Sequence, residues 1–263
     1  MLLAVDVGNT HIVLALYDGK EFLHNWRLQT RKEQTEDEFA AALRQLFLSA
    51  ELSFKDVHDV VLCSVVPDVS RNLDRLFKKY FNIEAHIVSK DSLKNSLTIN
   101  VDRPGDVGAD RLVNSIAAQD IISAPFIVID FGTATTFDVV DASNTYIGGA
   151  IAPGVNLSVK ALYEAAAKLP DIEIVKPSKA IGDSTVSAMQ SGVFWGYTGL
   201  INDILNRIKS ELDGEANVLA TGGLAGLFAD EIEGLTNIDE NLTLKGLVKI
   251  HEMKYKKAHV KVV

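Results

Sequence analysis

The sequence predicts an α/β protein built from two lobes that begin in the same way. Short apolar strand patterns alternate with amphipathic helical patterns along the chain, which is typical of α/β folds. An apolar run that ends in Asp-x-Gly and continues into a hairpin occurs at residues 2–17 and returns at residues 126–140. A length of 263 residues fits two modest lobes at roughly 150 residues per domain.

The first lobe is predicted from a series of periodic segments. Strands are expected at residues 2–6, 12–17 and 21–28, with a turn at Asp18-Gly19-Lys20 because glycine tolerates the positive φ of hairpin turns. A helix is expected at 35–48, where three acidic residues fall in the first turn and apolar residues share one face. The elements expected next are a strand at 60–66, a helix at 69–80, a short strand at 86–88 and a helix at 108–122.

The second lobe repeats this opening. A strand from Phe126 ends at Asp130, and further strands are expected at 136–140 and 146–151. The elements expected next are a helix at 156–168, a loop and an edge strand flanked by Pro170 and Pro177, one or two helices over 184–211, a strand at 218–220 and a helix at 242–252. Aligning Asp6 with Asp130 brings the hairpins into one register, which indicates an internal duplication. The alternative is that any two α/β lobes look alike, but the shared acid and glycine favour duplication.

The predicted boundary divides the chain into lobes at residues 1–118 and 119–263, and the last helix could pack back on the first lobe. No segment between them is rich in Pro, Gly or Ser, so the lobes are expected to abut with a cleft between them.

Composition restricts the class of protein. The chain is 47% hydrophobic and 23% charged, which excludes a disordered chain. The formal net charge of −9 disfavours a nucleic-acid partner, because such a protein needs a basic patch. The only basic stretch, Lys254 to Lys257, is expected to be a solvated or dimer-edge extension together with Lys261.

The single cysteine and the first residues bear on the compartment. Cys63 lies in the apolar run 60–66, where we expect an inert core residue rather than a reactive thiol. One cysteine allows no internal disulfide, residues 1–6 do not resemble a signal peptide, and no apolar run reaches about 18 residues. A cytoplasmic protein is expected.

Two tight turns could hold phosphate. In Asp6-Val7-Gly8-Asn9-Thr10, glycine lets the backbone approach a ligand, and the side chains of Asn9 and Thr10 can donate hydrogen bonds to phosphate oxygens. Asp6 could hold magnesium directly or through water. The turn at Asp130-Phe131-Gly132-Thr133-Ala134 repeats the device. The alternative is that each segment is an ordinary tight turn.

A third turn, Thr221-Gly222-Gly223, lacks large side chains and would let a flat base lie against the backbone, although an ordinary strand-to-helix turn has the same composition. The chain has neither a Walker A sequence nor a strand-linked GxGxxG fingerprint.

The segment Gly108-Ala109-Asp110-Arg111 places an acid and a guanidinium at the expected start of a helix. The carboxylate could orient or deprotonate an attacking hydroxyl, and the arginine could bind an anionic substrate. The alternative is helix N-terminal charge with a salt bridge. The three acids, Asp6, Asp110 and Asp130, together with the glycine turns, suggest phosphoryl transfer, which depends on positioning and charge neutralisation. No histidine or cysteine cluster has metal-ligand spacing.

These four motifs, in this order, resemble the type III pantothenate kinases, bacterial enzymes of the acetate kinase, sugar kinase, heat-shock 70 and actin superfamily. The resemblance runs almost end to end and includes the segments 148–154, 167–170, 190–193 and 242–247. It implies two duplicated ribonuclease H-like lobes with an ATP cleft between them, and an obligate homodimer. It also implies ATP-dependent phosphorylation of pantothenate to 4'-phosphopantothenate, the first step of coenzyme A biosynthesis, with Mg²⁺ and a monovalent cation, K⁺ or NH₄⁺.

The resemblance also implies roles for single residues. Asp110 would be the general base for the pantothenate hydroxyl, and Asp130 would ligate the monovalent cation. The pantothenate site would be lined by Gly108, Ala109, Asp110, Arg111, Thr185 and Val101. The ATP contacts would be made by Asp6, Val7, Gly8, Asn9, Thr10, His11, Ile12, Val13, Thr133, Gly222 and Gly223.

Two positions depart from the family pattern. Val101 stands where family members often carry a tyrosine, so the substrate wall lacks a phenol donor, and Ser184 replaces an asparagine before Thr185. Three alternatives remain open at this point: a regulatory or accessory protein on the same fold, an ATP-hydrolysing chaperone or filament subunit, and a kinase for another hydroxy acid.

Overall fold

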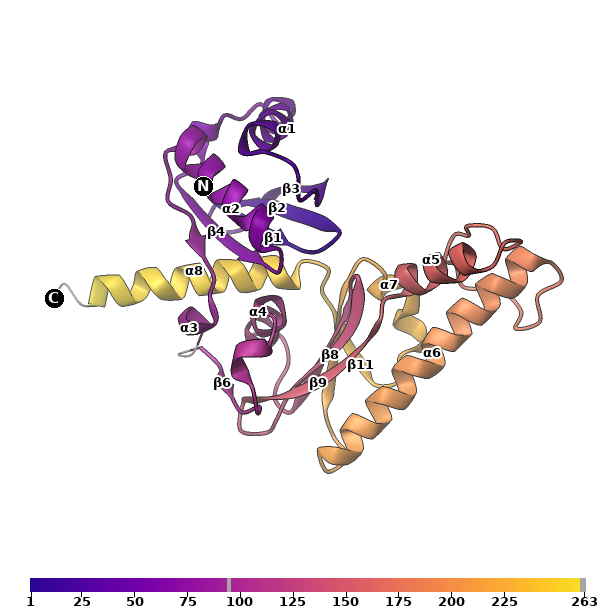
Figure 1. Ribbon diagram of the computed structural model, residues 1–263. Helices are drawn as coiled ribbons and strands as arrows, with labels where there is room; N and C mark the ends of the chain where they lie inside the picture. The colour runs from indigo at the N-terminus through magenta and orange to yellow at the C-terminus, as the bar shows by residue number, and fades with distance from the viewer. Residues whose placement is uncertain (94–95, 261–263) are drawn as a thin grey trace. The chain divides into compact units, whose positions relative to one another are not determined.

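The computed structural model describes residues 1–93 and 96–260 and divides the chain into two compact units (Figure 1). Unit 1 contains Met1–Leu97, Arg103–Ala117 and the last helix. Unit 2 contains Thr98–Asp102 and Ala118–Asn241. The last helix therefore belongs to the unit that also contains the N-terminus.

Unit 1 is built on a five-stranded sheet with the order β3-β2-β1-β4-β5. Strands β1, β2 and β3 form an antiparallel meander, and β4 and β5 continue the sheet in parallel. The turn between β2 and β3 forms as predicted, because Asp18 Oδ1 accepts hydrogen bonds from the backbone N–H groups of Lys20 (2.8 Å) and Glu21 (2.9 Å). The strands are β1 (Leu2–Val7), β2 (His11–Tyr17), β3 (Phe22–Gln29), β4 (Asp59–Ser64) and β5 (His86–Ile87).

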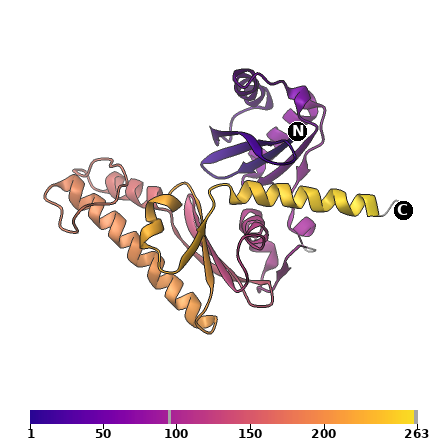
Figure 2. The ribbon, with the colours of Figure 1, turned by 180° about the vertical axis from the view of Figure 1, so that it is seen from behind.

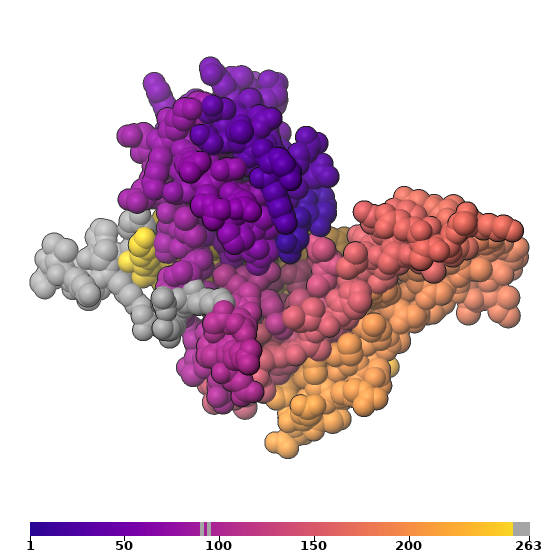
Figure 3. Space-filling view, viewed as in Figure 1, coloured from indigo at the N-terminus to yellow at the C-terminus, as the bar shows by residue number. Residues whose placement is uncertain are grey.

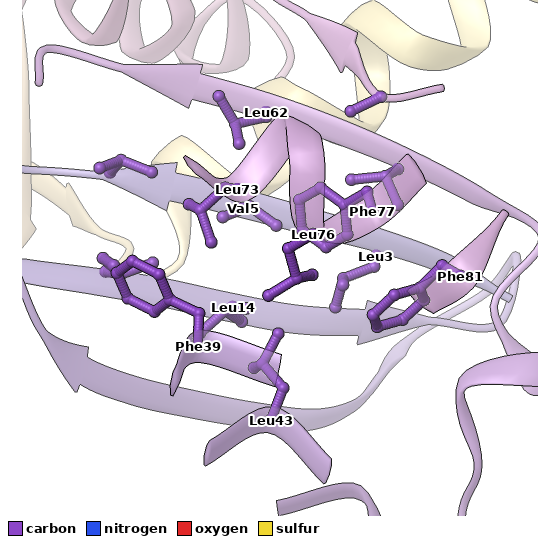
Figure 4. Close-up of a cluster of buried hydrophobic side chains, with 14 of the residues drawn as sticks. Leu3, Val5, Leu14, Phe39, Leu43, Leu62, Leu73, Leu76, Phe77 and Phe81 are labelled. Atoms are coloured by element: carbon purple, nitrogen blue, oxygen red, sulfur yellow. The ribbon is translucent and has the colours of Figure 1, made fainter. Parts of the chain in front are cut away.

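Helices cover both faces of this sheet. The unit contains α1 (Glu36–Ser49), α2 (Pro67–Leu76), α3 (Lys90–Leu93), α4 (Ala109–Ala118, which ends at the unit boundary) and α8 (Leu242–Val260), with short helical turns at Phe54–Asp56, Phe77–Phe81 and Pro104–Asp106. Apolar side chains of α1 and α2 pack on the alternate residues of β1, β2 and β4 that point to one face, as Figure 4 shows for Phe39 and Leu73 against Val5 and Leu14. Helix α8 packs against β1, β2 and β4.

Helix α1 begins where its sequence predicts. The Thr35 hydroxyl accepts from the backbone N–H of Glu38 at 3.4 Å, and the Glu38 carboxylate accepts from the backbone N–H of Thr35 at 2.8 Å. This reciprocal pair satisfies two N–H groups that the first turn leaves without helical partners.

Unit 2 is built on a six-stranded sheet with the order β11-β10-β7-β8-β9-β6. Its central hairpin, β7 and β8, is antiparallel, and β10 pairs in parallel with β7 on the other side. The strands are β6 (Thr98–Ile99), β7 (Phe126–Phe131), β8 (Ala134–Val140), β9 (Thr145–Pro153), β10 (Asn217–Gly222) and β11 (Leu235–Ile238).

The helices of unit 2 are α5 (Val155–Ala165), α6 (Thr185–Glu211) and α7 (Ala225–Phe228), with a short turn at Ala229–Glu231. The segment 184–211 forms one helix of 27 residues, which Figure 2 shows from behind without interruption. Phe194, Ile201 and Leu205 of α6 pack on Ile127 and Ile129 of β7, so this helix supplies most of the cover on one sheet face.

The two units repeat one another. Both sheets contain the same order of five strands when β1 is aligned with β7, because β3-β2-β1-β4-β5 corresponds to β9-β8-β7-β10-β11. The register irregularity between Leu16 and Tyr17 also has its counterpart between Val139 and Val140. These are equivalent places in the two hairpins, which confirms the duplication predicted from Asp6 and Asp130.

Several sequence predictions need correction. The edge strand expected between Pro170 and Pro177 does not form, because this segment lies along α6 as an irregular loop. There the Gln190 amide donates to Glu173 O (3.1 Å) and the Ser191 hydroxyl donates to Ala180 O (2.6 Å). The helix expected at 108–122 ends at Ala118, and the last helix continues to Val260. The expectation for the basic tail concerns, beyond Lys254, side chains that lie outside what the structure describes.

Candidate active site

The first predicted phosphate turn joins β1 to β2 and is held by backbone hydrogen bonds. Gly8 N–H donates to His11 O at 2.9 Å, the Thr30 hydroxyl donates to Gly8 O at 2.7 Å, and Thr30 N–H donates to Thr10 O at 2.9 Å. The side chains of Asn9 and Thr10 are exposed at the tip. The turn thus exposes hydrogen-bonding side chains, and Thr30, the residue that follows β3, holds its backbone in place.

At the end of this turn, the protonated form of the His11 imidazole is disfavoured. Partial burial and the nearby positive charge of Arg27 lower the pKa of its imidazole. A neutral imidazole adds no positive charge to the turn.

Asp6 and Asp110 lie near the same buried thiol in unit 1. Asp6 is the register partner of Cys63, on the neighbouring strand β4. Burial raises the pKa of the Cys63 thiol well above its ordinary value, and the negative charges of Asp6 and Asp110 raise it further. The thiol therefore stays protonated, which agrees with the inert core residue predicted for Cys63. The first-hairpin acid and the acid of the Gly-Ala-Asp-Arg element thus belong to the same compact unit.

Helix α4 places Asp110 in its first turn, as predicted. The Asp110 carboxylate accepts a hydrogen bond from the backbone N–H of Arg111 at 2.9 Å and folds back over Gly108, so that a Cβ at Gly108 would collide with it. Glycine at this position therefore lets the carboxylate adopt its orientation.

Helix α8 fixes α4 from behind. The Thr243 hydroxyl donates to Asn114 Oδ1 at 2.7 Å, and Lys249 Nζ donates to Ile116 O at 2.9 Å. A Cβ at Gly246 would come within 2.5 Å of Val113 O, so the backbones of the two helices approach closely. The last helix of the chain thereby supports the element that carries Asp110.

The second predicted turn, between β7 and β8 in unit 2, has hydroxyl groups on both sides of its acid. The register pairs Asp130 with Thr136 on β8 and with Thr221 on β10, so the three side chains form one row on one face of the sheet. The turn itself is closed by Gly132 N–H donating to Ala134 O (3.1 Å), and Gly154 N–H donates to Thr133 O (3.1 Å).

The third predicted turn lies directly beside this row. Gly222, the last residue of β10, has φ +90°, a conformation that favours glycine. A Cβ there would lie 2.7 Å from the backbone N and O of Phe131 and 2.8 Å from Asp130 Oδ1. Gly222 therefore leaves open a small space against the Asp130 carboxylate, and the backbone turns into the short helix α7, as expected of a strand-to-helix turn.

Two further residues predicted for the substrate site lie in unit 2. Thr185 is the exposed first residue of α6, after a cap in which the Ser184 hydroxyl accepts from Ser187 N–H at 3.2 Å. Val101 lies against Gly148 of β9, where a Cβ would meet Val101 Cγ1 at 3.8 Å. Unit 2 thus contains Thr185 and Val101, and unit 1 contains Gly108 to Arg111.

Sequence reasoning missed the polar residues next to Asp130. Thr136 was not selected, and Thr221 was named only as part of the third turn. Asp138 and Tyr146, two fully buried residues joined by a hydrogen bond, were not selected either. The signal was available in part, because Asp130 and Thr136 are symmetric about the turn and must be opposite one another in a tight hairpin.

The described part of the chain lacks two features that would point to other functions. Within residues 1–93 and 96–260, no three or more His, Cys, Asp or Glu side chains are grouped so that they could hold a metal ion by themselves. None of the described helices combines the length and the apolar character needed to span a bilayer.

Comparison with known proteins identifies the family. The family model for type III pantothenate kinase matches residues 2–207. A type III pantothenate kinase from Paramagnetospirillum magneticum is 51% identical over 251 residues, which cover 95% of this chain and 96% of the relative.

Solved structures support the fold alone. A Campylobacter jejuni protein described as a Baf family transcriptional activator has a TM-score of 0.59 at 20% identity and covers 97% of this chain and 99% of its own. MreB 5 of Spiroplasma citri, bound to AMPPNP, has a TM-score of 0.56 at 13% identity, with 100% and 98% covered. Both likenesses support the two-unit α/β fold described above. On the family match and the 51% identical relative, the chain belongs to the type III pantothenate kinases.

Proposed function

We propose that this protein transfers the γ-phosphoryl group of ATP to the hydroxyl of pantothenate and forms 4'-phosphopantothenate, the first step of coenzyme A biosynthesis. Membership of the type III pantothenate kinases supports this reaction. The observation that carries the proposal within the structure is that the Asp6 hairpin and the helix start that bears Asp110 lie in one compact unit, where Asp6 pairs in register with Cys63. A phosphate-binding turn and an acid able to activate a hydroxyl therefore lie in one unit.

Asp110 would act on the attacking hydroxyl. A carboxylate is too weak a base to hold the proton of an aliphatic alcohol before reaction, so it would orient the hydroxyl first and accept the proton late, as the new P–O bond forms. Arg111, next to it on α4, would bind the carboxylate of pantothenate, a pairing for which a guanidinium is well suited. Thr185 and Val101 would complete contacts to the substrate.

The nucleotide would be bound by the three turns. The exposed Asn9 and Thr10 side chains and the backbone of residues 6–13 would contact its phosphates, as would Thr133, and Gly222 and Gly223 would face the base. Mg²⁺ usually keeps several waters and is held in kinases by one or two carboxylates and the nucleotide phosphates, a demand that the single carboxylate of Asp6 fits. Bound Mg²⁺ would supply neutralisation of phosphate charge.

A monovalent cation, K⁺ or NH₄⁺, would bind at Asp130. Its neighbours fit such an ion, because Thr136 and Thr221 place hydroxyl oxygens in the same row. The space that a Cβ at Gly222 would fill lies directly against Asp130 Oδ1.

A homodimer would cover an apolar surface of unit 2. Large apolar side chains stand exposed on α5 and around the start of α6, including Leu157, Leu162 and Val186, and Ile181 is 87% exposed. Figure 3 shows α5 and α6 on the surface of the unit. An apolar surface of this kind usually marks a protein contact, and sedimentation of the purified protein would test the dimer. We propose that the protein acts in the cytoplasm.

The experiment that tests the reaction is ATP-dependent conversion of pantothenate to phosphopantothenate in K⁺, NH₄⁺ and Na⁺ buffers. We expect turnover in K⁺ or NH₄⁺ that collapses in Na⁺. Other hydroxy acids, assayed side by side, would test substrate choice.

The matched variants are Asp110→Asn and Asp106→Asn. Asp110→Asn should fold, bind ATP and lose most turnover, because the amide cannot accept the proton. Asp106→Asn changes an exposed acid in the preceding loop and should retain turnover. Unchanged turnover in Asp110→Asn would remove Asp110 from this role. Absence of turnover in folded, ATP-binding wild-type protein would contradict the kinase and favour the regulatory alternative.

A further inference from the structure

We propose that Thr136 supplies a second oxygen ligand for the monovalent cation at Asp130, and that Asp138 and Tyr146 are positioning residues that fix the orientation of its hydroxyl. The inference rests on the proposed function, because it assumes a cation beside Asp130. It goes beyond it by assigning three residues that neither the motifs nor the family comparison selects.

The first step is the register of the hairpin. Asp130 and Thr136 are direct partners across β7 and β8. The Gly132-to-Ala134 hydrogen bond closes the turn two residues away, which makes this a hydrogen-bonded pair with Cα atoms about 5.5 Å apart. Side chains of such a pair stand next to each other on one face of the sheet. The Thr136 hydroxyl and the Asp130 carboxylate are therefore neighbours.

The second step is the direction of the hydroxyl proton. Thr136 Oγ1 donates to Asp138 Oδ2 at 3.0 Å. A threonine hydroxyl has one proton and two lone pairs, so a hydroxyl that donates to Asp138 has only lone pairs to offer other neighbours. Thr136 thus presents an acceptor, which suits a cation, where a free hydroxyl could instead donate to the carboxylate of Asp130.

The third step is the anchoring of Asp138. Tyr146 OH donates to Asp138 Oδ1 at 2.9 Å, and both residues are fully buried. Burying a carboxylate lowers the stability of the fold unless hydrogen bonds satisfy its oxygens. The hydrogen bond from Tyr146 is therefore needed to keep Asp138 in the core. Each carboxylate oxygen accepts one of these hydroxyl protons, and the Asp138 side chain has little freedom to release Thr136.

The duplication provides an internal comparison. When Asp6 is aligned with Asp130, the positions equivalent to Thr136, Asp138 and Tyr146 are occupied by Val13, Ala15 and Phe22. The equivalent of Thr221 is Cys63. At these four equivalent positions the first hairpin carries the acid's neighbours without a hydroxyl group, apart from the turn itself. The polar network is particular to the second hairpin, where the cation is proposed.

The proposed ligand set suits a monovalent ion. Asp130 is the one carboxylate placed to contact the cation directly, because both oxygens of Asp138 accept hydroxyl protons from Thr136 and Tyr146, whereas divalent ions prefer sites with more carboxylate ligands. Neutral oxygens are also the ligands that replace the hydration shell of K⁺ in proteins.

The experiment measures cation binding directly, by ²⁰⁵Tl NMR titration of the full-length protein with Tl⁺ as the K⁺-sized probe. Thr136→Val installs the side chain of the first hairpin, and we expect it to weaken Tl⁺ binding at least tenfold. Thr136→Ser retains the hydroxyl and should bind within about threefold of wild type. Tyr146→Phe removes only the proton donated to Asp138 and should weaken binding by an intermediate factor. Thr145→Val, on β9 of the same unit, is the matched control and should bind Tl⁺ like wild type.

Kinetics give a second readout. In Thr136→Val, the K⁺ concentration for half-maximal activity should rise at least tenfold, and KM for pantothenate should change less than twofold. Tl⁺ binding by Thr136→Val equal to that of wild type would overturn the assignment of Thr136 and leave the kinase intact. Wild-type protein that turns over pantothenate without binding Tl⁺ would overturn both this inference and the cation site. Wild-type protein that binds Tl⁺ without turnover would contradict the kinase alone.

Discussion

Gly222→Ala should destabilise the β7–β8 hairpin of unit 2 by more than a loss of backbone flexibility alone would cause. Gly222 has φ +90°, outside the range that alanine adopts without strain. The added Cβ would lie 2.7 Å from two backbone atoms of Phe131, which cannot rotate away as a flexible side chain would. It would also lie 2.8 Å from Asp130 Oδ1, so that carboxylate must move.

The magnitude follows from these two effects. A left-handed backbone costs an L-residue about 1–2 kcal/mol, and forcing an extra carbon into a packed site costs about 1–3 kcal/mol. Reduced freedom of the unfolded chain returns about 0.4–1 kcal/mol. We expect the free energy of unfolding to fall by about 2–4 kcal/mol, and Tm to fall by roughly 5–15 °C.

The assay is urea unfolding followed by circular dichroism, with kinase activity measured on the same samples. Gly226→Ala is the matched control, because Gly226 lies in α7 and a Cβ there meets no atom within 4 Å. Alanine is the better helix former, so this control should be neutral or stabilised by about 0.5–1 kcal/mol. If Gly222→Ala and Gly226→Ala were equally stable and equally active, the steric argument would be refuted.

The remaining predictions concern unit 1. Thr35→Ala removes the cap of α1 and should lower the free energy of unfolding by about 1 kcal/mol, measured by urea titration, whereas Thr35→Ser should retain most of it. Burial, helped by the charge of Lys254 and by His251, lowers the pKa of His86 to about 4, so the unfolded state binds more protons between that value and about 6.5. Stability from this site is complete above about pH 6.5 and is lost as the pH falls toward 4. With allowance for solvent screening of a half-exposed ring, the loss between pH 7 and pH 5 is about 1 kcal/mol. In His86→Gln this part of the pH dependence should be missing, and an unchanged pH profile would contradict the argument.

Much of the fold follows from local pattern. The strands of both hairpins lie within two residues of their predicted bounds, because a buried strand that ends in Asp-x-Gly leaves few alternatives for the chain. The prediction of an edge strand at 170–177 was wrong because contacts with a distant part of the chain, and not the local pattern, determine the conformation there. The prolines of this segment suggested an edge strand, but the segment is tied to α6 by a hydrogen bond from the Gln190 amide to Glu173 O, a long-range contact that no local pattern reveals.

The candidate site was predictable in its charged residues and not in its neutral ones. Asp6 and Asp130 stand out in sequence because each ends an apolar strand at a tight turn that contains glycine, and Asp110 stands out because it lies beside Arg111 in a motif that begins with glycine. Thr136 and Tyr146 are ordinary strand residues, and they acquire significance only when the register places them around Asp130 and Asp138. Residue roles that depend on pairing across strands need the structure.

The position of α8 has a consequence for synthesis of the protein. This helix begins at Leu242, yet it packs on β1 and β4 and braces α4 in unit 1. At about 5–20 residues per second, a ribosome takes roughly 7–30 s to translate from Leu97, the end of unit 1's first segment, to the start of this helix. During that interval the face of the N-terminal sheet that α8 covers stays exposed to solvent while unit 2 is synthesised. The unit that is made first is therefore the last to be completed, and nascent chains stalled before residue 242 should require a chaperone to stay soluble.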